Sequence, residues 1–288
     1  MLLGYLLIVI ASILWSLSPA IISRFSRRIR PVTFTGLRAS IASATLLILF
    51  LVRGAGIDSL SYVAIAVVTL SAIIGPGVGD VLYTKSIQAL GGFLAVVLGY
   101  TYIFIAQAIA VFFLGELAKA TLVFGSLLAF VGVVIAVQGG INRERPLNIK
   151  ARGVAYAVMA SVSWGVSASL IKVALNFADE LTLTLLRLST IAIVFLPAGL
   201  LSEGVPLKGD LKLLLLIATI TATLDWTLGM YIFVCSIGII GVSATAVVTA
   251  LTPVLSTITT RLIAREKPLL TNITGALLTS AGIIVTAL

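Results

Sequence analysis

Long apolar runs separated by short polar connections make up most of this chain. Each run is about 20 residues long, the length that an α-helix needs to cross a bilayer core of about 30 Å. The pattern predicts ten helices, at roughly residues 2–22, 33–52, 61–88, 92–114, 120–139, 152–173, 181–201, 211–235, 242–263 and 269–288. The fold class is therefore an all-α polytopic membrane protein, whose connections are too short to hold a soluble domain.

The residue pattern of one half returns in the other. Trp15-Ser16-Leu17-Ser18 and Arg38 recur 149 residues later as Trp164-Gly165-Val166-Ser167 and Arg187. Farther along, the offset becomes 150: Glu116, Thr121, Gly125 and Gly132 match Glu266, Thr271, Gly275 and Gly282. One long period indicates a duplicated unit rather than a solenoid. We predict a first repeat at 1–139, a linker at 140–150 and a second repeat at 151–288. Five helices per repeat is an odd number, so the second repeat should be inverted in the membrane, as in secondary transporters.

Composition supports the membrane assignment and excludes several functions. Hydrophobic residues make up 60% of the 288 positions and charged residues 10%, with a mean hydropathy of +1.23; soluble domains carry about 25% charged residues. The net charge of +9 lies in the connections, where it faces lipid headgroups rather than nucleic acid. One cysteine, Cys235, and no histidine exclude disulfide frameworks, His/Cys metal sites and histidine catalysis. We expect no metal and no cofactor.

The basic residues also predict an orientation. The face that holds the termini has three of them, whereas the opposite face has thirteen. By the positive-inside rule this bias places both termini outside. The first run has no basic segment before it and no clear cleavage site, so we expect a retained helix rather than a removed signal peptide.

Four ionisable residues interrupt the apolar runs and are candidate substrate-binding residues: Arg38, Asp80, Arg187 and Asp225. A charge at the centre of a membrane helix costs roughly 2.5–3.5 kcal/mol even on insertion scales, so each needs a partner or water. We predict an Arg38–Asp80 pair and an Arg187–Asp225 pair facing a cavity between the repeats. Alternatively, the pairs only fix neighbouring helices against each other.

Aromatic and small polar residues complete the candidate site. We expect Trp15, Tyr83, Tyr100 and Trp164 to line the cavity, within a wider aromatic set that includes Tyr102, Trp226 and Tyr231. The alternative is anchoring at the membrane interface or core packing. Thr249 and Thr252 precede Pro253, which frees the carbonyl of Thr249 and can bend the helix. Pro253 and Pro76, the latter between Gly75 and Gly77, are therefore candidate gating residues. The Thr side chains could instead bond within their own helix.

Repeated glycines and glutamates are assigned to structure. Gly125, Gly132, Gly275 and Gly282 allow close helix approach, either inside a monomer or at the seam of a homodimer. Glu116 and Glu266 precede the fifth and tenth helices, where a carboxylate favours a positive helix end.

Together these features resemble the EamA family of the drug/metabolite transporter superfamily. The matching features are the two five-helix halves, Trp15 and Trp164, Arg38 and Arg187, Leu114-Gly115-Glu116, and Thr252-Pro253 before Arg265-Glu266. The chain departs from the pattern at Ile103, which matches Pro253, and at Ala264-Arg265-Glu266, which replaces Leu-Gly-Glu. The resemblance implies export or exchange of small metabolites such as amino acids, at the plasma membrane. It also implies termini inside the cell for many bacterial members, and this alternative to the charge count stays open.

The function predicted is a secondary transporter that moves a small molecule by alternating access. No phosphate loop or ATPase domain is visible, so the drive is proton coupling or exchange. The partners expected are the small-molecule substrate and membrane lipids. The alternatives are a multidrug or cation efflux carrier, a membrane-embedded enzyme and a passive channel. The enzyme is disfavoured because no nucleophile–base set is visible.

Overall fold

Helices form the regular structure throughout the described part of the chain. The computed structural model describes residues 1–53, 61–115, 120–140, 147–204 and 208–285. Eight stretches are long and apolar enough to cross a membrane: Leu2–Arg24, Pro31–Val52, Tyr62–Leu90, Gly92–Phe113, Asn148–Ala174, Glu180–Glu203, Leu211–Ile240 and Val242–Ala264. Two shorter apolar stretches, Leu127–Ala136 and Leu270–Val285, lie in the predicted fifth and tenth helices. The chain is an all-helical, multi-pass integral membrane protein, and ten crossings remain a prediction.

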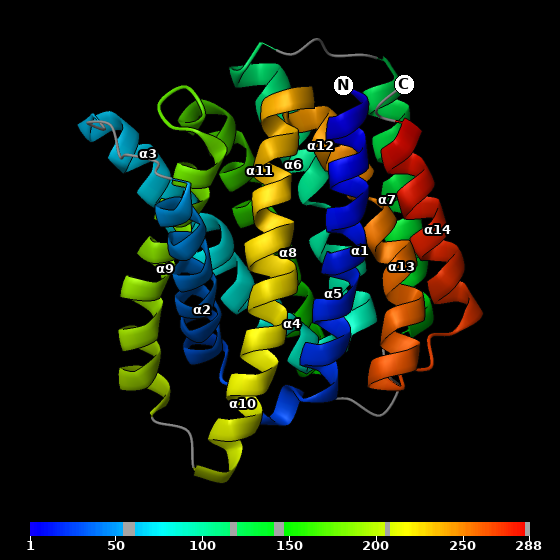
Figure 1. Ribbon diagram of the computed structural model, residues 1–288. Helices are drawn as coiled ribbons and strands as arrows, with labels where there is room; N and C mark the ends of the chain where they lie inside the picture. Colours follow the sequence, from blue (N-terminus) through cyan, green and yellow to red (C-terminus); the bar gives the residue numbers. More distant parts are fainter. Residues whose placement is uncertain (54–60, 116–119, 141–146, 205–207, 286–288) are drawn as a thin grey trace.

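The two halves contain corresponding elements (Figure 1). The first half contains α1 (Leu2–Arg24), η1 (Ser26–Arg28), α2 (Pro31–Val52), α3 (Tyr62–Ala72), η2 (Ile73–Gly79), α4 (Asp80–Leu90), α5 (Gly92–Gly99), α6 (Tyr102–Phe113) and α7 (Ala120–Gly140). The second contains α8 (Leu147–Ala174), α9 (Glu180–Glu203), α10 (Lys208–Thr221), η3 (Ala222–Gly229), α11 (Met230–Ile240), α12 (Val242–Val248), α13 (Leu251–Thr259), η4 (Thr260–Ala264) and α14 (Leu270–Val285). Helix α8 begins inside the predicted linker, of which residues 141–146 lie outside the described residues.

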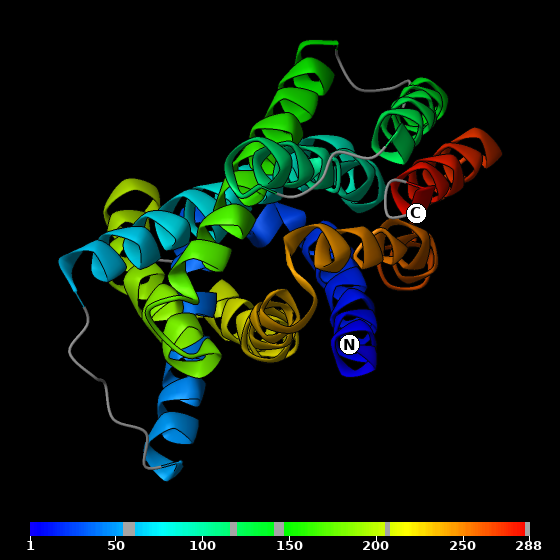
Figure 2. The same cartoon turned by 90° about the horizontal axis from the view of Figure 1, so that it is seen from above.

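Contacts between the halves are reciprocal. Both termini lie at one end of the bundle (Figure 1). Seen from above, α7 and α14 lie together on one side, and α2 and α9 lie together on the other (Figure 2). These pairs join the fifth helices and the second helices of the halves. Likewise α1 packs against α11, α12 and α13 of the second half, while α8 packs against α3, α4, α5 and α6 of the first. Each half thus completes the core of the other.

A π-helical segment interrupts the third helix of each half at matching positions. These segments are η2 (Ile73–Gly79) and η3 (Ala222–Gly229). Pro76 lies inside η2, where its missing N–H and its ring cannot fit a regular α-helical turn. The wider π turn accommodates the proline while the helix continues. Gly75-Pro76-Gly77 therefore lies within a continuous π-helical stretch.

The repeated glycines bring α7 and α14 into backbone contact. A Cβ atom on Gly132 would lie 2.4 Å from the backbone nitrogen of Thr279, and one on Gly275 would lie 2.4 Å from that of Ala136. On Gly282 it would lie 2.3 Å from the backbone nitrogen of Ala129. Only glycine permits this approach, so these glycine faces serve packing within one chain.

Glu266 has the structural role predicted for it, but on a different helix. Its carboxylate accepts hydrogen bonds from the backbone N–H groups of Gly92 (2.6 Å) and Phe93 (3.0 Å) and from the hydroxyl of Ser23. It therefore stabilises the N-terminus of α5 in the other half, instead of that of α14. The approach is possible because Gly91 turns the chain with a φ of 94°. Glu116 lies outside the described residues.

Candidate functional site

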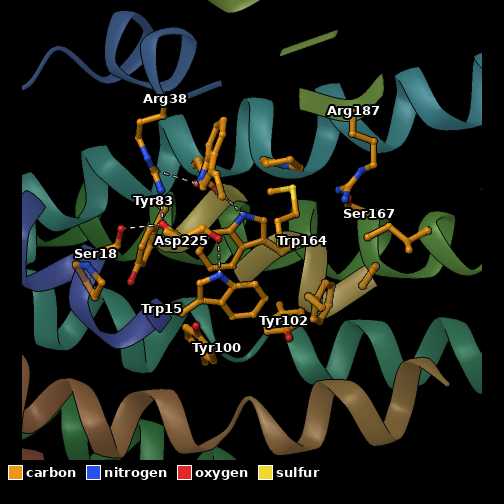
Figure 3. Close-up of a pocket in the computed structure, with 18 of the residues that line it drawn as sticks. Trp15, Ser18, Arg38, Tyr83, Tyr100, Tyr102, Trp164, Ser167, Arg187 and Asp225 are labelled. Atoms are coloured by element: carbon orange, nitrogen blue, oxygen red, sulfur yellow. Dashed lines mark hydrogen bonds and ion pairs between the residues drawn. The ribbon is translucent and has the colours of Figure 1, made fainter. Parts of the chain in front are cut away.

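A cavity between the halves gathers residues from both of them. It encloses about 110 Å³, room for several water molecules or part of a small solute. Its lining comes from α1, α2, η2, α4, α6, α8, α9, η3 and α11, together with Tyr100 between α5 and α6. All four ionisable residues predicted for the site line it: Arg38, Asp80, Arg187 and Asp225. Figure 3 shows Arg38 and Asp225 beside the aromatic residues of the lining, and Arg187 beside Ser167.

The π-helical segments place the two aspartates. Asp80 is the first residue of α4, directly after η2, whereas Asp225 lies inside η3. The two carboxylates therefore occupy unequal positions in the repeat: they are 145 residues apart, whereas the repeat offset is 149 or 150. π-Helical turns frequently mark functional sites, because they turn side chains away from the regular helical register.

Arg38 binds both aspartates. Its Nη1 lies 3.4 Å from Oδ2 of Asp80, and its Nη2 donates to Oδ2 of Asp225. Its guanidinium also lies over the indole of Trp226, 4.5 Å from the ring centroid, a cation–π contact. The Arg38 side chain is 2% exposed, whereas the aspartate side chains are 13% and 16% exposed. The cluster formed by Arg38, Asp80 and Asp225 is therefore a buried ionic triad whose carboxylates border the cavity.

The predicted Arg187–Asp225 pair does not form. The ion pairs of the described residues that involve Asp225 or Asp80 go to Arg38 alone. Arg187 instead donates from Nη2 to Oγ of Ser167, at 3.0 Å, while its Nε and Nη1 have no acceptor. The position of each residue along its helix could not reveal this arrangement, because the pairing depends on which helices of the two halves meet.

The two repeated tryptophans reach across to the opposite half. Nε1 of Trp164 donates to Oδ1 of Asp80 at 2.9 Å, and Nε1 of Trp15 donates to the backbone carbonyl of Asp225 at 3.1 Å. Each indole packs against a glycine at the end of a π-helical segment. A Cβ on Gly79 would lie 2.8 Å from Trp164, and one on Gly229 would lie 2.5 Å from Trp15. The repeated tryptophans thus hold the aspartates from the opposite half.

Aromatic rings form much of the cavity wall. Trp164 makes edge-to-face contacts with Tyr83, Tyr100 and Tyr102, with centroid distances of 4.8, 6.4 and 6.2 Å. Trp15 contacts Phe233 at 5.1 Å. Such a wall suits a solute with an apolar or aromatic part.

The candidate residues of the ninth helix lie elsewhere. Thr249, Thr252 and Pro253 are buried and do not line the cavity. The hydroxyl of Tyr102 lies 2.8 Å from Oγ1 of Thr249, and Oγ1 of Thr252 donates to the backbone carbonyl of Ser12 at 3.4 Å. Thr249 therefore holds the hydroxyl of Tyr102, a residue of the cavity wall. Pro76, the other candidate gating residue, does line the cavity.

Two serines in the site were not selected from the sequence. Ser18 donates to Oδ2 of Asp225 at 2.7 Å, and Ser167 accepts from Arg187. They occupy the same place in the repeated Trp-x-x-Ser motif, 149 residues apart, so the repeat itself carried the signal. Tyr102 and Trp226, which stood only in the wider aromatic set, also line the cavity.

Comparisons with known proteins agree with this architecture. A search of functionally curated proteins finds no match to the chain. One protein of known crystal structure aligns with 98% of this chain and 95% of its own, with a TM-score of 0.70 and 19% sequence identity; at that identity, the likeness concerns the fold alone. The model of the EamA-like transporter family matches residues 2–138 and again residues 151–288. The chain therefore belongs to the EamA-like transporter family.

Proposed function

We propose that the protein is a secondary transporter whose substrate site is the cavity between the two halves. The observation that carries the proposal is the location of that cavity: both halves line it, and four ionisable residues border it. Intramembrane charges are expensive and mark substrate or ion pathways. The family supports transport of small solutes, rather than an enzymatic reaction.

In this proposal the halves are inverted repeats that expose the cavity alternately to each side of the membrane. The reciprocal contacts of α1 and α8, and the pairing of α2 with α9 and α7 with α14, support a two-fold relation. Substrate sites at the interface of such repeats lie near the bilayer midplane. A plasma-membrane location is part of the proposal.

One gate lies at the end opposite the termini, in the conformation described. There Arg24 donates to the carbonyl of Ile263 at 2.8 Å, and Glu266 caps α5. Both contacts join α1 or α5 of the first half to the chain around η4 in the second half. Glu203, at the end of α9, likewise accepts from the backbone of Val32 (3.1 Å) and Thr33 (2.9 Å) in α2. We assign these contacts to the closed gate and call the Glu266 contact with α5 the Glu266 latch.

Counterflow in proteoliposomes tests the proposal. Vesicles preloaded with a mixture of unlabelled amino acids and aromatic carboxylates are diluted into a labelled mixture of the same solutes. A carrier accumulates label transiently and saturably, without chemical change to the solute. Arg38→Met should abolish the signal, because both carboxylates of the triad lose their partner, whereas the exposed Arg261→Gln should retain it. Uptake without trans-stimulation would indicate a channel, and a converted solute would indicate an enzyme.

Substitutions in the triad test separately whether a proton gradient drives transport. If protons are coupled, the titrating group is Asp225 or Asp80, the two carboxylates that border the cavity. Asn in place of the titrating residue, in either Asp225→Asn or Asp80→Asn, should then make counterflow independent of pH while net uptake driven by a pH gradient disappears. Unchanged gradient-driven uptake in both Asp225→Asn and Asp80→Asn would place the coupling group elsewhere. If a pH gradient drives no uptake by the unsubstituted protein, exchange is the mechanism.

A further inference from the structure

Arg187 is a buried cation that makes no ion pair with any described residue. We propose that it binds a carboxylate group of the transported solute, so that the substrate class is an amphipathic carboxylate with an apolar or aromatic body. This inference rests on the proposed function of the cavity as a carrier site and adds the chemistry of the solute to it.

The hydrogen bonds of Arg187 are incomplete. The residue is 2% exposed, and it lines the cavity. A guanidinium has five N–H donors, yet among the described residues only Nη2 has a partner, the neutral hydroxyl of Ser167. Nε and Nη1 are buried without an acceptor. A buried charge left unpaired in a membrane protein is costly, so these donors call for an anionic partner.

The aspartates of the cavity are already engaged. Asp80 forms an ion pair with Arg38 and accepts hydrogen bonds from the indole N–H groups of Trp164 (2.9 Å) and Trp226 (3.2 Å). Asp225 forms an ion pair with Arg38 and accepts a hydrogen bond from Ser18. Figure 3 shows the guanidinium of Arg187 beside Ser167 and apart from the Arg38 side chain. Asp80 attracts Arg187 electrostatically, but no described carboxylate makes an ion pair with it. A solute carboxylate would supply that direct partner.

The backbone leaves room beside the guanidinium. A Cβ on Gly75 would lie 2.1 Å from Oγ of Ser167 and 3.6 Å from Nη2 of Arg187. Because Gly75, inside η2, has no side chain, the hydroxyl of Ser167 has room to reach Arg187. Ser167 is fixed in turn by donating to the backbone carbonyl of Ser71 at 2.8 Å. The result is a preorganised guanidinium, the side chain best matched to a planar carboxylate.

The remaining wall selects the rest of the solute. Trp164, Tyr102 and Phe233 present aromatic surface to the cavity, and Ala168 and Ile171 present aliphatic surface on α8. An apolar body would lie against this surface while its carboxylate meets Arg187. Free carboxylic acids and amino acids share this chemistry, and the test below separates them from amines and neutral solutes.

Intrinsic fluorescence of purified protein in detergent tests the inference. The chain has three tryptophans, and all of them, Trp15, Trp164 and Trp226, line the cavity. The probes are phenylacetate, phenylacetamide and phenethylamine, which share a ring but differ in charge; phenylalanine shows whether an added ammonium group is accepted. Phenylacetate should change the fluorescence saturably, and the amide and amine should bind at least about tenfold more weakly, because they lack the charge-assisted bond.

Variants locate the effect at Arg187. Arg187→Gln should weaken phenylacetate binding by at least about tenfold, Arg187→Lys by less, and the exposed control Arg261→Gln should leave it unchanged. Equal binding of all probes, preference for the amine, or full binding by a folded Arg187→Gln variant would overturn the inference. Absence of binding by all four probes would overturn it as well. Binding needs no transport, so carboxylate binding without counterflow would refute the carrier alone, and counterflow of other solutes without carboxylate binding would refute the inference alone.

Discussion

The two buried arginines illustrate how the same residue type has opposite energetic consequences. Arg38 forms ion pairs with two carboxylates, whereas the hydrogen-bond partner of Arg187 among the described residues is the neutral hydroxyl of Ser167. Removing one partner of a buried ionic cluster leaves uncompensated charge and costs about 3–5 kcal/mol. Removing a buried charge that has no ion-pair partner instead removes the free-energy cost of burying it, and so does not destabilise the fold.

These residues give the first prediction. Arg38→Met should lower the thermal unfolding temperature in detergent strongly, whereas Arg187→Met should leave it unchanged or raise it in the absence of solute. Both variants replace a long buried side chain by an apolar one, so each controls for the other. An equally destabilised Arg187→Met would show that Arg187 supports the fold and would count against a binding role.

Asp179 provides a pH-dependent prediction outside the membrane-spanning helices. Its Oδ1 accepts from the backbone N–H groups of Leu181 (3.0 Å) and Thr182 (3.2 Å), so it is the N-cap of α9. Partial burial raises its pKa, but the hydrogen bonds from the Thr182 side chain and from the backbone outweigh burial and lower the pKa overall. A lowered folded-state pKa means that the stabilisation is present above the unfolded pKa and is lost as the pH falls through the folded value.

Asp179→Ala should therefore destabilise the protein by about 1 kcal/mol at neutral pH. The difference from the unsubstituted protein should shrink as the pH falls below about 4. Thermal unfolding from pH 7 to pH 3 measures it, with the exposed Lys212→Gln as a control. A difference that persists unchanged at pH 3 would contradict a role for the ionised cap.

At the scale of elements, the Glu266 latch joins α5 to the segment after η4. Glu266→Gln keeps the shape but loses the charge that favours the helix N-terminus, so the gate opposite the termini should open more often. A cysteine placed at Ala168 in a Cys235→Ala background reports this opening through faster labelling by a membrane-impermeant thiol reagent from that side. Glu180→Gln, at the start of α9 near the other end, is the matched control. Equal labelling rates would place the gate elsewhere.

The α7–α14 pair gives the second prediction at this scale. Because the backbones touch at Gly275, Gly275→Val should separate the helices and cost about 1–3 kcal/mol. Leu277→Val, on the exposed side of α14, should cost much less. Thermal unfolding compares the two variants. A harmless Gly275→Val would mean that the helices can move apart freely.

At the scale of the whole molecule, much of the architecture was accessible from hydrophobic periodicity and from the repeat. The sequence predicted the helices, and it predicted that Arg38, Arg187 and the two aspartates border one cavity. The partners of those residues did not, because α1 and α8 reach into opposite halves and the π-helical segments shift Asp80 and Asp225 differently. That Thr249 and Thr252 lie outside the cavity lining could not be predicted either, because polarity alone does not reveal which face of a helix meets the cavity.

Alternating access to the cavity is tested most directly with a single cysteine on its wall. Ala168→Cys in the Cys235→Ala background places one thiol beside Trp164 and Ser167 on α8. In proteoliposomes of known orientation, a membrane-impermeant thiol reagent should label this cysteine when added to either side, and transported solute should slow the labelling from both. Labelling from one side only, or from neither, would contradict a carrier that exposes this cavity alternately to the two faces of the membrane.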